Sequence, residues 1–494
     1  MRFRTDSVPL TLPPRSATLP AGRWLCSALR AAILDGRLRP GARLPATRDL
    51  AMRYRLSRGT IVAAFEQIRS EGYITARSGS GTYVSTVLPD SLLEVRAQTP
   101  VPRSVRSPRL RRLSDIGTRV RPFPPASPNP ARAFRANQPA LDLFPTTLWA
   151  QVAGRRLRCA SVDLLKGCDP LGYAPLRRAV ADYLHHARGV VCVPEQVAIV
   201  SGVQEALDLV ARLFVNPGDG VCIENPCYTG AALSFEALGA KLSTLPLDDD
   251  GVRVPRVPRP GVRLIYVTPA HQFPVGVSMS LARRLALLDW ARRSEALIFE
   301  DDYDSEFRYA GPPVPAMQGL DRHGVVLFAG SFSKVLFPSI RLGYLVLPTD
   351  LVERTAAMKS VANRFAPVLD QAVLCDFMTE GHFGRHVRRM RQAYAERLAV
   401  LLESARQSLA GLLEISELEA GLQTTGWLCG KVAGAAAAAA AARRRVEVTP
   451  LSRYSRSPLA REGVVLGFAA VDVREIRRGV RELAIALEQC RRAP

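Results

Sequence analysis

The stretch Val325-Val326-Leu327-Phe328, followed by Ser331-Phe332-Ser333-Lys334, decides how most of this 494-residue chain folds. Its first part is apolar and β-branched, which favours a buried strand, and its second part is a polar turn that carries a lysine. Similar apolar runs alternate with amphipathic helical patterns, at residues 197–200, 220–223, 264–267 and 297–299. This alternation predicts an α/β domain built on a mainly parallel sheet.

An alanine run at 435–442 lies nearer the C-terminus and is followed by three arginines and then by Val446-Glu447-Val448. Alanine has the highest helix propensity, and cations stabilise the C-terminal end of a helix. We therefore expect a helix here that leads into a strand at 446–448.

Length and charge indicate more than one domain. A chain of 494 residues exceeds what one hydrophobic core usually serves. Of the net charge of +22, +16 falls within the first 135 residues. A basic excess at one end favours a polyanionic partner, and nucleic acid is favoured over membrane because no amphipathic basic helix stands out. The alternative is a solvated, arginine-rich surface.

Targeting and metal signals are weak. The N-terminal residues lead into no apolar segment of a signal peptide, and no long apolar run predicts a membrane span. The nine cysteines form no CxxC pair and no Cys/His cluster with metal spacing. We expect a cytoplasmic protein with reduced thiols, no membrane association and no metal site.

Three regions follow from composition. Residues 1–86 hold part of the basic excess together with a compact helical pattern, and residues 136–494 hold the α/β alternation. Between them, residues 87–135 are rich in Pro, Arg and Ser and have little apolar periodicity. We expect this middle segment to be a partly extended, mobile linker.

The N-terminal region has the spacing of a helix-turn-helix. Helices are predicted at 23–35, 47–53 and 57–70, and Ser57 is the expected N-cap of the third. In such a fold the first turn of the third helix enters the major groove of double-stranded DNA. Arg58, Gly59 and Thr60 are then predicted to face base edges, Ser57 to hold phosphate and Arg48 to contact the DNA backbone.

Two short strands follow the helices. Residues 72–77 and 81–85 alternate with period two around Ser78-Gly79-Ser80, a hairpin tip that glycine allows to approach a narrow groove. Gly79 and Arg77 are therefore predicted DNA contacts, with Arg77 in the minor groove. The alternative is an ordinary helical hairpin with surface arginines.

Three segments of this region, at 36–45, 56–62 and 79–84, closely resemble the GntR-family winged helix. The resemblance spans roughly 65 residues and implies a DNA-binding domain.

The lysine turn fits the chemistry of pyridoxal 5'-phosphate, which needs an amine for a Schiff base, an anion at the ring nitrogen and a polar cup for phosphate. Lys334 is the candidate amine. The hydroxyls of Ser331 and Ser333 and the guanidinium of Arg341 are candidate phosphate donors. A surface lysine in a loop is the alternative for this motif taken alone.

Further elements complete the cofactor hypothesis. Asp301 ends a strand and is predicted to hold the pyridine nitrogen, while Tyr303 is predicted to hydrogen-bond the ring oxygen. Tyr228 offers a face for stacking. A strand joins a helix through Gly202-Val203-Gln204, whose amides are predicted to receive the phosphate. Residues 268–276 supply a polar turn at another strand end, the edge where open α/β sheets bind ligands.

Residues 137–494 resemble fold-type I aminotransferases, and the whole chain resembles the MocR/GabR regulators, which fuse a GntR-type winged helix to such a domain. The residues of segments 271–274 and 300–307 are typical of that group. The resemblance implies pyridoxal 5'-phosphate on Lys334 and a head-to-tail homodimer in which each winged helix packs on the partner's large domain. It also implies control of transcription in response to a small amine, an amino acid or the cofactor itself.

The sequence departs from these families at several positions. Phe273 stands where catalytic aminotransferases usually have Asn, which argues against efficient transamination. Regulators that bind a carboxylate-bearing amino acid have arginines near Gly230 and Val465, so we expect an effector other than a simple γ-amino acid. Gly167 stands where a tyrosine would reach the phosphate across the dimer.

Three hypotheses follow. The first is a dimeric regulator that senses through a Schiff base at Lys334. The alternative is an active aminotransferase with an accessory DNA-binding domain. The third is a regulator whose large domain is a dimerisation scaffold without cofactor.

Overall fold

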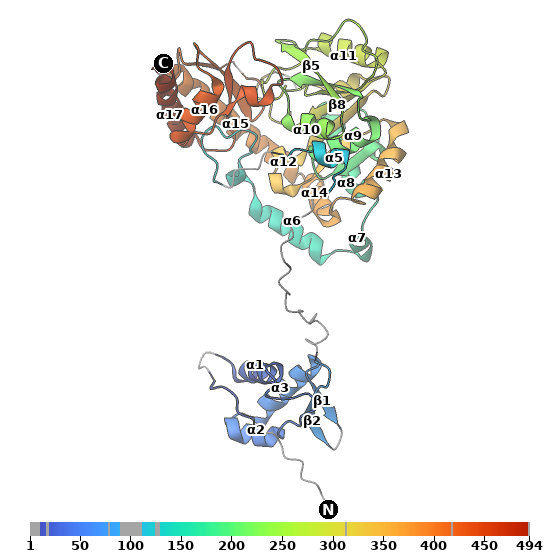
Figure 1. Cartoon of the computed structure of the whole chain (residues 1–494), viewed down its shortest axis with the longest axis vertical. Helices are drawn as coiled ribbons and strands as arrows, with labels where there is room; N and C mark the ends of the chain where they lie inside the picture. Colours follow the sequence, from blue (N-terminus) through green and yellow to red (C-terminus); the bar gives the residue numbers. More distant parts are fainter. Residues whose placement is uncertain are drawn as a thin grey trace, which may run out of the picture. The chain divides into compact units, whose positions relative to one another are not determined.

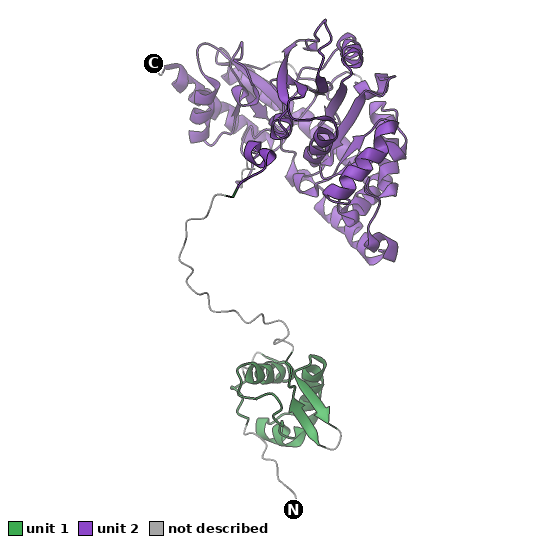
Figure 2. Ribbon diagram, turned by 45° about the vertical axis from the view of Figure 1, so that its right-hand side comes forward, with its two compact units in different colours: residues 1–111 green, residues 112–494 purple. Residues whose placement is uncertain are grey.

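A computed structural model describes residues 10–15, 19–77, 80–88, 111–123, 129–311, 314–415 and 418–492. The chain divides into two compact units, residues 1–111 and residues 112–494, which Figure 2 draws in different colours. Each unit has its own hydrophobic core.

The described residues of the first unit form three helices and a two-stranded hairpin (Figure 1). Their bounds are α1 (Ala21–Leu34), α2 (Thr47–Tyr54), α3 (Arg58–Ser70), β1 (Ile74–Arg77) and β2 (Gly81–Val84), and the two strands pair antiparallel. The predicted helices and strands are thus confirmed, with ends shifted by one or two residues.

Helices α1 and α3 pack through apolar faces that recur every three or four residues. Leu25 and Leu29 of α1 are buried with Ile61 and Ile68 of α3. Gly36 ends the turn after α1 with a φ of 77°, a conformation that glycine adopts without strain. The tight core therefore fixes the orientation of α3, whose opposite face is exposed.

Part of the segment predicted to be a mobile linker is ordered against the second unit. Residues 115–119 form α5 (Asp115–Arg119), and Nε of Arg119 donates to the carbonyl of Ala237, 3.2 Å away. Ala133 and Phe134 are fully buried in the core of the second unit. Residues 89–110 and 124–128 of the predicted linker lie outside the described residues.

The second unit is built on an eight-stranded sheet of order β3-β10-β9-β8-β7-β4-β5-β6. The central strands pair parallel, while β10 is antiparallel to both β3 and β9, and β6 is antiparallel to β5. The mainly parallel sheet predicted from the apolar runs is confirmed. The bounds are β3 (Val197–Val200), β4 (Gly220–Asn225), β5 (Lys241–Asp248), β6 (Gly251–Val252), β7 (Val262–Val267), β8 (Leu297–Asp302), β9 (Val326–Ser331) and β10 (Gly343–Val346).

Both faces of this sheet are covered, which explains why its central strands contain continuous apolar runs rather than an alternation of apolar and polar residues. Val221 and Ile223 of β4 pack in one core cluster and Cys222, between them, packs in another. The helices are α6 (Thr146–Arg158), α7 (Val162–Lys166), α8 (Ala174–Arg188), α9 (Val203–Phe214), α10 (Thr229–Ala237), α11 (Leu281–Arg293), α12 (Phe332–Val335), α13 (Val352–Ala362) and α14 (Val368–Thr379). Among the helices of the described residues, none is both long enough and apolar enough to cross a membrane.

A four-stranded antiparallel sheet of order β11-β12-β14-β13 forms the C-terminal part of the unit (Figure 1). The prediction of a strand at 446–448 is wrong, because the strand, β13, covers Thr449–Pro450 directly after it. The backbone N–H of Val446 donates to the carbonyl of Ala441 in the preceding helix, and that of Glu447 donates to the carbonyl of Ala133. The elements are β11 (Leu413–Ile415), β12 (Gln423–Leu428), β13 (Thr449–Pro450), β14 (Gly463–Gly467), α15 (His382–Ser408), α16 (Gly434–Arg443) and α17 (Val473–Arg492).

Candidate functional site

The first turn of α3 presents the predicted DNA contacts on the surface. Arg58 and Gly59 are exposed, and Thr60 is half-buried. Ser57 caps the helix, because its Oγ accepts from the backbone N–H of Thr60 at 3.1 Å and lies 2.8 Å from the Thr60 hydroxyl. The Ser57 hydroxyl is thus already engaged within its own helix, and Arg58 is the long cationic side chain of this turn.

The remaining predicted contacts lie on α2 and the hairpin. Arg48 is exposed in the first turn of α2. Arg77 is exposed at the end of β1, and its guanidinium carbon stands 5.0 Å from the ring centre of Tyr83, so the ring holds the cation near the hairpin tip. Gly79 lies outside the described residues.

In the second unit, the predicted cofactor residues gather at one edge of the large sheet. The parallel strands β4, β7, β8 and β9 all end there, so residues far apart in sequence meet. Asp301 is next to the end of β8, and Lys334 follows the end of β9 on the short helix α12. The structure thus brings the predicted amine and the predicted anion to the same edge.

Lys334 is the amine of this site. Its Nζ donates to the backbone carbonyl of Asn137 at 2.6 Å. Burial lowers the pKa of Lys334 to about 8, although the carboxylates of Asp304 and Asp301 oppose this shift. The amine is therefore neutral at a much lower pH than an ordinary lysine, which makes it a nucleophile. Sequence reasoning missed Asn137, since a backbone acceptor leaves no residue signature.

Asp301 is buried, and one of its carboxylate oxygens has no hydrogen-bond partner. Its Oδ2 accepts from the hydroxyl of Tyr266 at 2.7 Å, and its Oδ1 has no partner. Burial raises the pKa of Asp301 to about 7, while the hydrogen bond from Tyr266 acts in the other direction. A cationic ring nitrogen at Oδ1 would satisfy this acceptor and favour the charged carboxylate. Tyr266, inside an apolar strand, was not among the predicted residues.

Tyr303 belongs to a buried chain of three polar side chains. Its hydroxyl lies 2.9 Å from Nδ1 of His271, which is 3.1 Å from both oxygens of Asp304. Burial raises the pKa of Tyr303 well above its usual value, so the hydroxyl keeps its proton. The chain fixes the position of Tyr303 at the sheet edge. His271 and Asp304 were quoted in the sequence motifs without an assigned role.

The predicted phosphate end combines a helix start with an arginine. Gly202, with a φ of 102°, precedes α9, whose N-terminus has no side-chain cap. A Cβ at Gly202 would stand 3.5 Å from a terminal nitrogen of Arg341, so the glycine and the guanidinium adjoin each other. Free amides at a helix N-terminus and a neighbouring guanidinium together suit an oxyanion.

Four further predicted phosphate residues differ in their present contacts. The hydroxyl of Ser333 is buried without a partner, whereas the Ser331 oxygen accepts from the backbone N–H of Ser333 at 3.2 Å. The Gln204 side chain turns away and donates to the hydroxyl of Ser234 at 2.6 Å. Val203 begins α9. For Val203 and Gln204 it is therefore the backbone amide that can serve a phosphate.

An aromatic wall lines the site. The ring of Phe273 stands 5.9 Å from the ring of Tyr228, 5.7 Å from that of Tyr303 and 5.1 Å from that of Tyr454, edge to face in each case. The ring of Phe123, from the ordered part of the predicted linker, lies 6.2 Å from the ring of Tyr228. Phe273 is therefore packed among aromatic rings, and Tyr454 joins the wall from the C-terminal part of the chain.

The structure shows what surrounds Gly230, Gly167 and Val465, the three positions at which the sequence departs from the related families. A Cβ at Gly230 would lie 2.5 Å from the Tyr228 ring and from Oε1 of Gln204. A Cβ at Gly167, where φ is +117°, would lie 2.5 Å from the Phe365 ring. Val465 is fully buried in β14. The surroundings of these positions are thus packed for small or apolar residues, and no arginine or tyrosine fits there without rearrangement.

Taken together, the residues fit pyridoxal 5'-phosphate. Buried polar atoms usually have partners, yet Asp301 Oδ1 and Ser333 Oγ have none in this region. These atoms, the amine of Lys334 and the corner between Gly202 and Arg341 meet the three needs of the cofactor: an anion, an amine and a phosphate cup.

Comparison with known proteins supports both halves of this description. Residues 24–84 match the family of bacterial regulatory proteins of the gntR type, and residues 134–478 match the class I and II aminotransferases. A probable rhizopine catabolism regulatory protein, MocR of Rhizobium meliloti, is 40% identical over 96% of this chain and 94% of its own length. This chain belongs to the MocR-type transcriptional regulators.

Other relatives extend the comparison. A pyridoxine biosynthesis transcriptional regulator, PdxR of Corynebacterium glutamicum, is 29% identical to this MocR-type chain over 97% of it and 98% of its own length. Among solved structures, the kynurenine aminotransferase of Pyrococcus horikoshii, determined with PMP, has a TM-score of 0.68 and 25% identity. That match covers 74% of this chain and 93% of the other. The second unit therefore has the fold of a pyridoxal-phosphate aminotransferase.

Proposed function

We propose that this MocR-type regulator binds double-stranded operator DNA through α3 and the β1–β2 hairpin. We also propose that it holds pyridoxal 5'-phosphate through Lys334 and responds to a small amine, an amino acid or the cofactor itself. The observation that carries the cofactor proposal is the pairing of Lys334, an amine with a lowered pKa, with Asp301, whose buried Oδ1 has no partner.

When bound, pyridoxal 5'-phosphate supplies an aldehyde that reacts with primary amines. The chain's own residues provide the setting. Asp301 holds a proton on the ring nitrogen, Tyr303 keeps its hydroxyl proton for the ring oxygen, and the α9 amides with Arg341 receive the phosphate. Lys334 offers a neutral amine at a pH near 8. These roles support a site that captures amines covalently and specifically.

DNA affinity would come mostly from arginine contacts to phosphates and discrimination from α3. Arg48, Arg58 and Arg77 are all exposed, and they lie on α2, α3 and β1 respectively. Because Ser57 is engaged as a cap, we assign the base-reading role in the first turn chiefly to Arg58. A bidentate arginine to guanine is the commonest specific contact of this kind.

We propose that the active form is a homodimer in a head-to-tail arrangement. Three apolar side chains on α6 and α7 support an interface with a second copy: Leu157, Val162 and Leu165 are 55%, 70% and 64% exposed. Apolar side chains grouped on neighbouring helices favour burial against a partner surface. Sedimentation of the purified protein tests this, and a monomer at micromolar concentration would contradict it.

The ordered end of the predicted linker offers a path from effector to DNA. Phe123 contacts Tyr228, the proposed stacking residue, and α5 packs on α10. A ligand that moves Tyr228 would therefore change how residues 111–123 sit on the second unit. A ligand can shift DNA occupancy only by binding one arrangement better than another, and we propose that this contact is made in one arrangement and lost in the other.

Efficient transamination is not part of the proposal, because Phe273 packs an apolar ring where a polar contact to the ring oxygen would otherwise lie. The competing reading is an active aminotransferase with an accessory DNA-binding domain. A turnover assay with a panel of amino acids and a keto acid separates the two. Repeated release of keto product at useful rates would establish the enzyme.

The deciding experiment follows the visible absorption of the cofactor-loaded, full-length protein during titration with amines, amino acids and peptides. A sensor is expected to give a ligand whose absorption change stops at a stable end point and that also changes binding to operator DNA. Lys334→Ala should lose both responses. Lys241→Ala, which removes an exposed lysine of β5, is the matched control and should keep both.

A further inference from the structure

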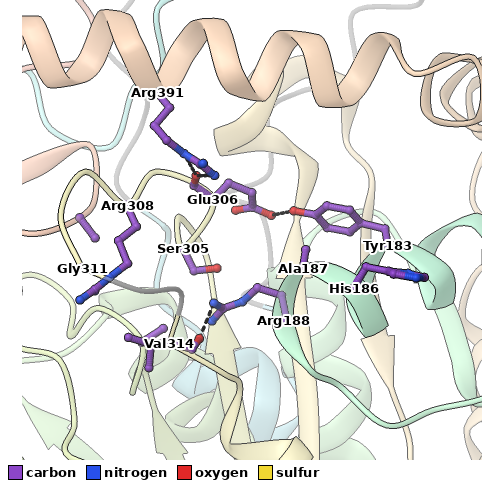
Figure 3. A pocket seen from close by; sticks show the side chains of 12 residues that line it. Tyr183, His186, Ala187, Arg188, Ser305, Glu306, Arg308, Gly311, Val314 and Arg391 are labelled. Carbon is purple, nitrogen blue, oxygen red and sulfur yellow. Dashed lines mark hydrogen bonds between the residues drawn. The ribbon is translucent and has the colours of Figure 1, made fainter.

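A cavity lies in the second unit, apart from the proposed cofactor residues. Its volume is about 300 Å³, and it lies at the C-terminal end of α8 and beside the segment that follows β8 (Figure 3). None of the cofactor residues proposed above is among the described residues that line it. A volume of this order is at the small end of ligand pockets, enough for a small metabolite.

Three side chains that line the cavity have a buried donor without a partner. These donors are Nη2 of Arg188, Oγ of Ser305 and Nε of Arg308. Figure 3 shows Ser305 between Arg188 and Arg308, with Arg391 of α15 reaching toward Glu306 from above. Buried donors without partners are rare in proteins, and three around one cavity indicate a missing acceptor.

The two arginines among them are held in place by other groups. Nε of Arg188 donates to Asp302 at 2.7 Å and its Nη1 donates to the carbonyl of Val314 at 2.6 Å. Arg188 is only 5% exposed. Arg308 pairs with Glu419 through its Nη2. These contacts hold the two guanidinium groups, while Nη2 of Arg188, Nε of Arg308 and also Oδ1 of Asp302 are left without partners.

Among the described lining residues basic side chains outnumber acidic ones, and two of them, Arg188 and Arg308, also pair with carboxylates outside the lining, Asp302 and Glu419. Arg188, Arg308 and Arg391 are the basic side chains of the lining, together with His186, and Glu306 is its acidic side chain among the described residues. The Glu306 carboxylate already accepts from the Tyr183 hydroxyl at 3.0 Å, and two nitrogens of Arg391 donate to the Glu306 backbone carbonyl. Carboxylates and phosphates are the usual acceptors for clustered guanidinium groups.

We propose that this cavity is a second ligand site, which binds a small oxyanion, either a carboxylate or a phosphate, through Arg188, Ser305 and Arg308. The bound oxygen atoms accept from the three unpartnered donors. Glu306 stands beside them and accepts from a hydroxyl or amine elsewhere on the ligand. The site itself does not depend on the proposed cofactor function.

The cavity adjoins the cofactor residues along the chain. Asp302, which pairs with Arg188, directly follows Asp301, and Ala270, which lines the cavity, directly precedes His271. An anion that tightens Arg188 and Ser305 would therefore shift the backbone next to Asp301 and Tyr303. We expect occupancy to alter the visible absorption of the cofactor-loaded protein, as a second readout in addition to binding.

The test is isothermal titration calorimetry of the full-length, cofactor-loaded protein with sodium acetate and, separately, sodium phosphate, at constant ionic strength kept with chloride. Loading the cofactor fills the phosphate corner near Arg341. The expected result is saturable binding of one anion per chain by at least one of the two probes. Preference for acetate identifies a carboxylate ligand, and preference for phosphate identifies a phosphate ligand.

Two variants locate the binding. Ser305→Ala removes only an atom that has no partner, and Arg308→Gln removes a donor from a surface ion pair, so both should fold. We expect each to weaken binding, Arg308→Gln by about tenfold or more. Arg212→Gln is the matched control, because Arg212 also pairs with a carboxylate, Asp208 at 2.8 Å, on the exposed face of α9. Arg212→Gln should bind as the unaltered protein does.

Three outcomes would overturn the proposal. They are the absence of saturable binding by either probe at millimolar concentration, an equal loss in Arg212→Gln, and loss in Arg341→Gln with full retention in Arg308→Gln. The last would place the anion at the cofactor corner instead. Failure of DNA binding would leave this measurement unaffected. If cofactor capture fails, the comparison of Arg308→Gln with Arg341→Gln still shows which site holds the anion, so the two proposals fail separately.

Discussion

The two units differ in where they keep their proposed functional side chains. In the first unit, Arg48, Arg58 and Arg77 are exposed on different elements and point away from the core. In the second, Asp301 and Tyr303 are buried, and each touches another polar side chain of the site. The first arrangement suits a surface read by a large partner, and the second suits a small molecule enclosed by fixed groups.

The two units also differ in how far apart in sequence their hydrogen-bonded residues lie. Ser57 caps α3 through Thr60, three residues away. The hydrogen bond from Tyr266 to Asp301 joins residues 35 apart, and that from Lys334 to Asn137 joins residues 197 apart. A change at the surface of the first unit should therefore have local effects, whereas a change in the second site acts through the whole fold.

The largest effect should come from Lys334→Ala. Without the amine we expect complete loss of the visible absorption of bound cofactor and of any effector response, while DNA affinity stays within about twofold because the two units are separate. Absorption spectra and fluorescence anisotropy with labelled operator measure the two quantities. An effector response that persists in Lys334→Ala would remove the cofactor from the mechanism.

Arg58→Ala should lower discrimination between operator and random DNA. The loss of a base contact is expected to cost about 1–3 kcal/mol on the operator and much less on random sequence. Arg69→Ala, at the other end of α3, removes the same charge and serves as control. Equal weakening on both DNAs would make Arg58 a phosphate contact instead.

The rate of cofactor capture should depend on pH through Lys334. Burial lowers the pKa of its amine to about 8, so the reactive neutral form is a small fraction at pH 7 and dominates at pH 9. We expect the second-order rate with pyridoxal 5'-phosphate to rise about tenfold over this interval and to level off above it. A rate that still climbs tenfold per pH unit above pH 9 would indicate an ordinary lysine.

Ser57→Ala should destabilise the first unit alone. Removal of the cap that receives the Thr60 N–H is expected to cost about 1 kcal/mol of unfolding free energy. Ser70→Ala, at the exposed C-terminal end of the same helix, should cost less. Thermal unfolding followed by circular dichroism measures both, and equal losses would show that the cap contributes nothing specific.

The smallest effect should come from Phe123→Ala. The side chain is 52% exposed, so stability should hardly change, but its contact with Tyr228 would be lost. We expect the effector-induced change in DNA affinity to fall by about twofold, which corresponds to a weak aromatic pair. Leu113→Ala, in the same segment, is the control. An unchanged effector response would remove this contact from the path between the units.

Local patterns were sufficient for much of this protein. The helices and hairpin of the first unit and five strands of the large sheet lie where apolar periodicity and caps predicted them, because those signals act over a few residues. The strand predicted at 446–448 failed because a backbone contact with Ala133 takes the N–H of Glu447. Such a partner, more than 300 residues away, leaves no local signal.

The candidate cofactor site likewise contains residues that local sequence patterns predict and residues that depend on distant contacts. Lys334, Asp301, Tyr303 and Arg341 could be predicted because charged and polar residues after apolar strands are unusual in sequence. Asn137, Tyr266 and Tyr454 were missed, because each acts through a backbone atom, an apolar strand or a distant segment. The cavity that we propose as an anion site was not predicted either, since its arginines come from α8, α15 and the segment after β8.

The sequence by itself determined the fold class, the two families and the amine and anion of the candidate cofactor site, because these depend on residue type and short-range order. Only the tertiary structure decided which polar atoms lack partners, how far burial lowers the pKa of Lys334, and that Gly230 and Gly167 have no room for a side chain. The physical reason is that desolvation, hydrogen-bond satisfaction and packing depend on all neighbours in space, and most of those neighbours are distant in sequence.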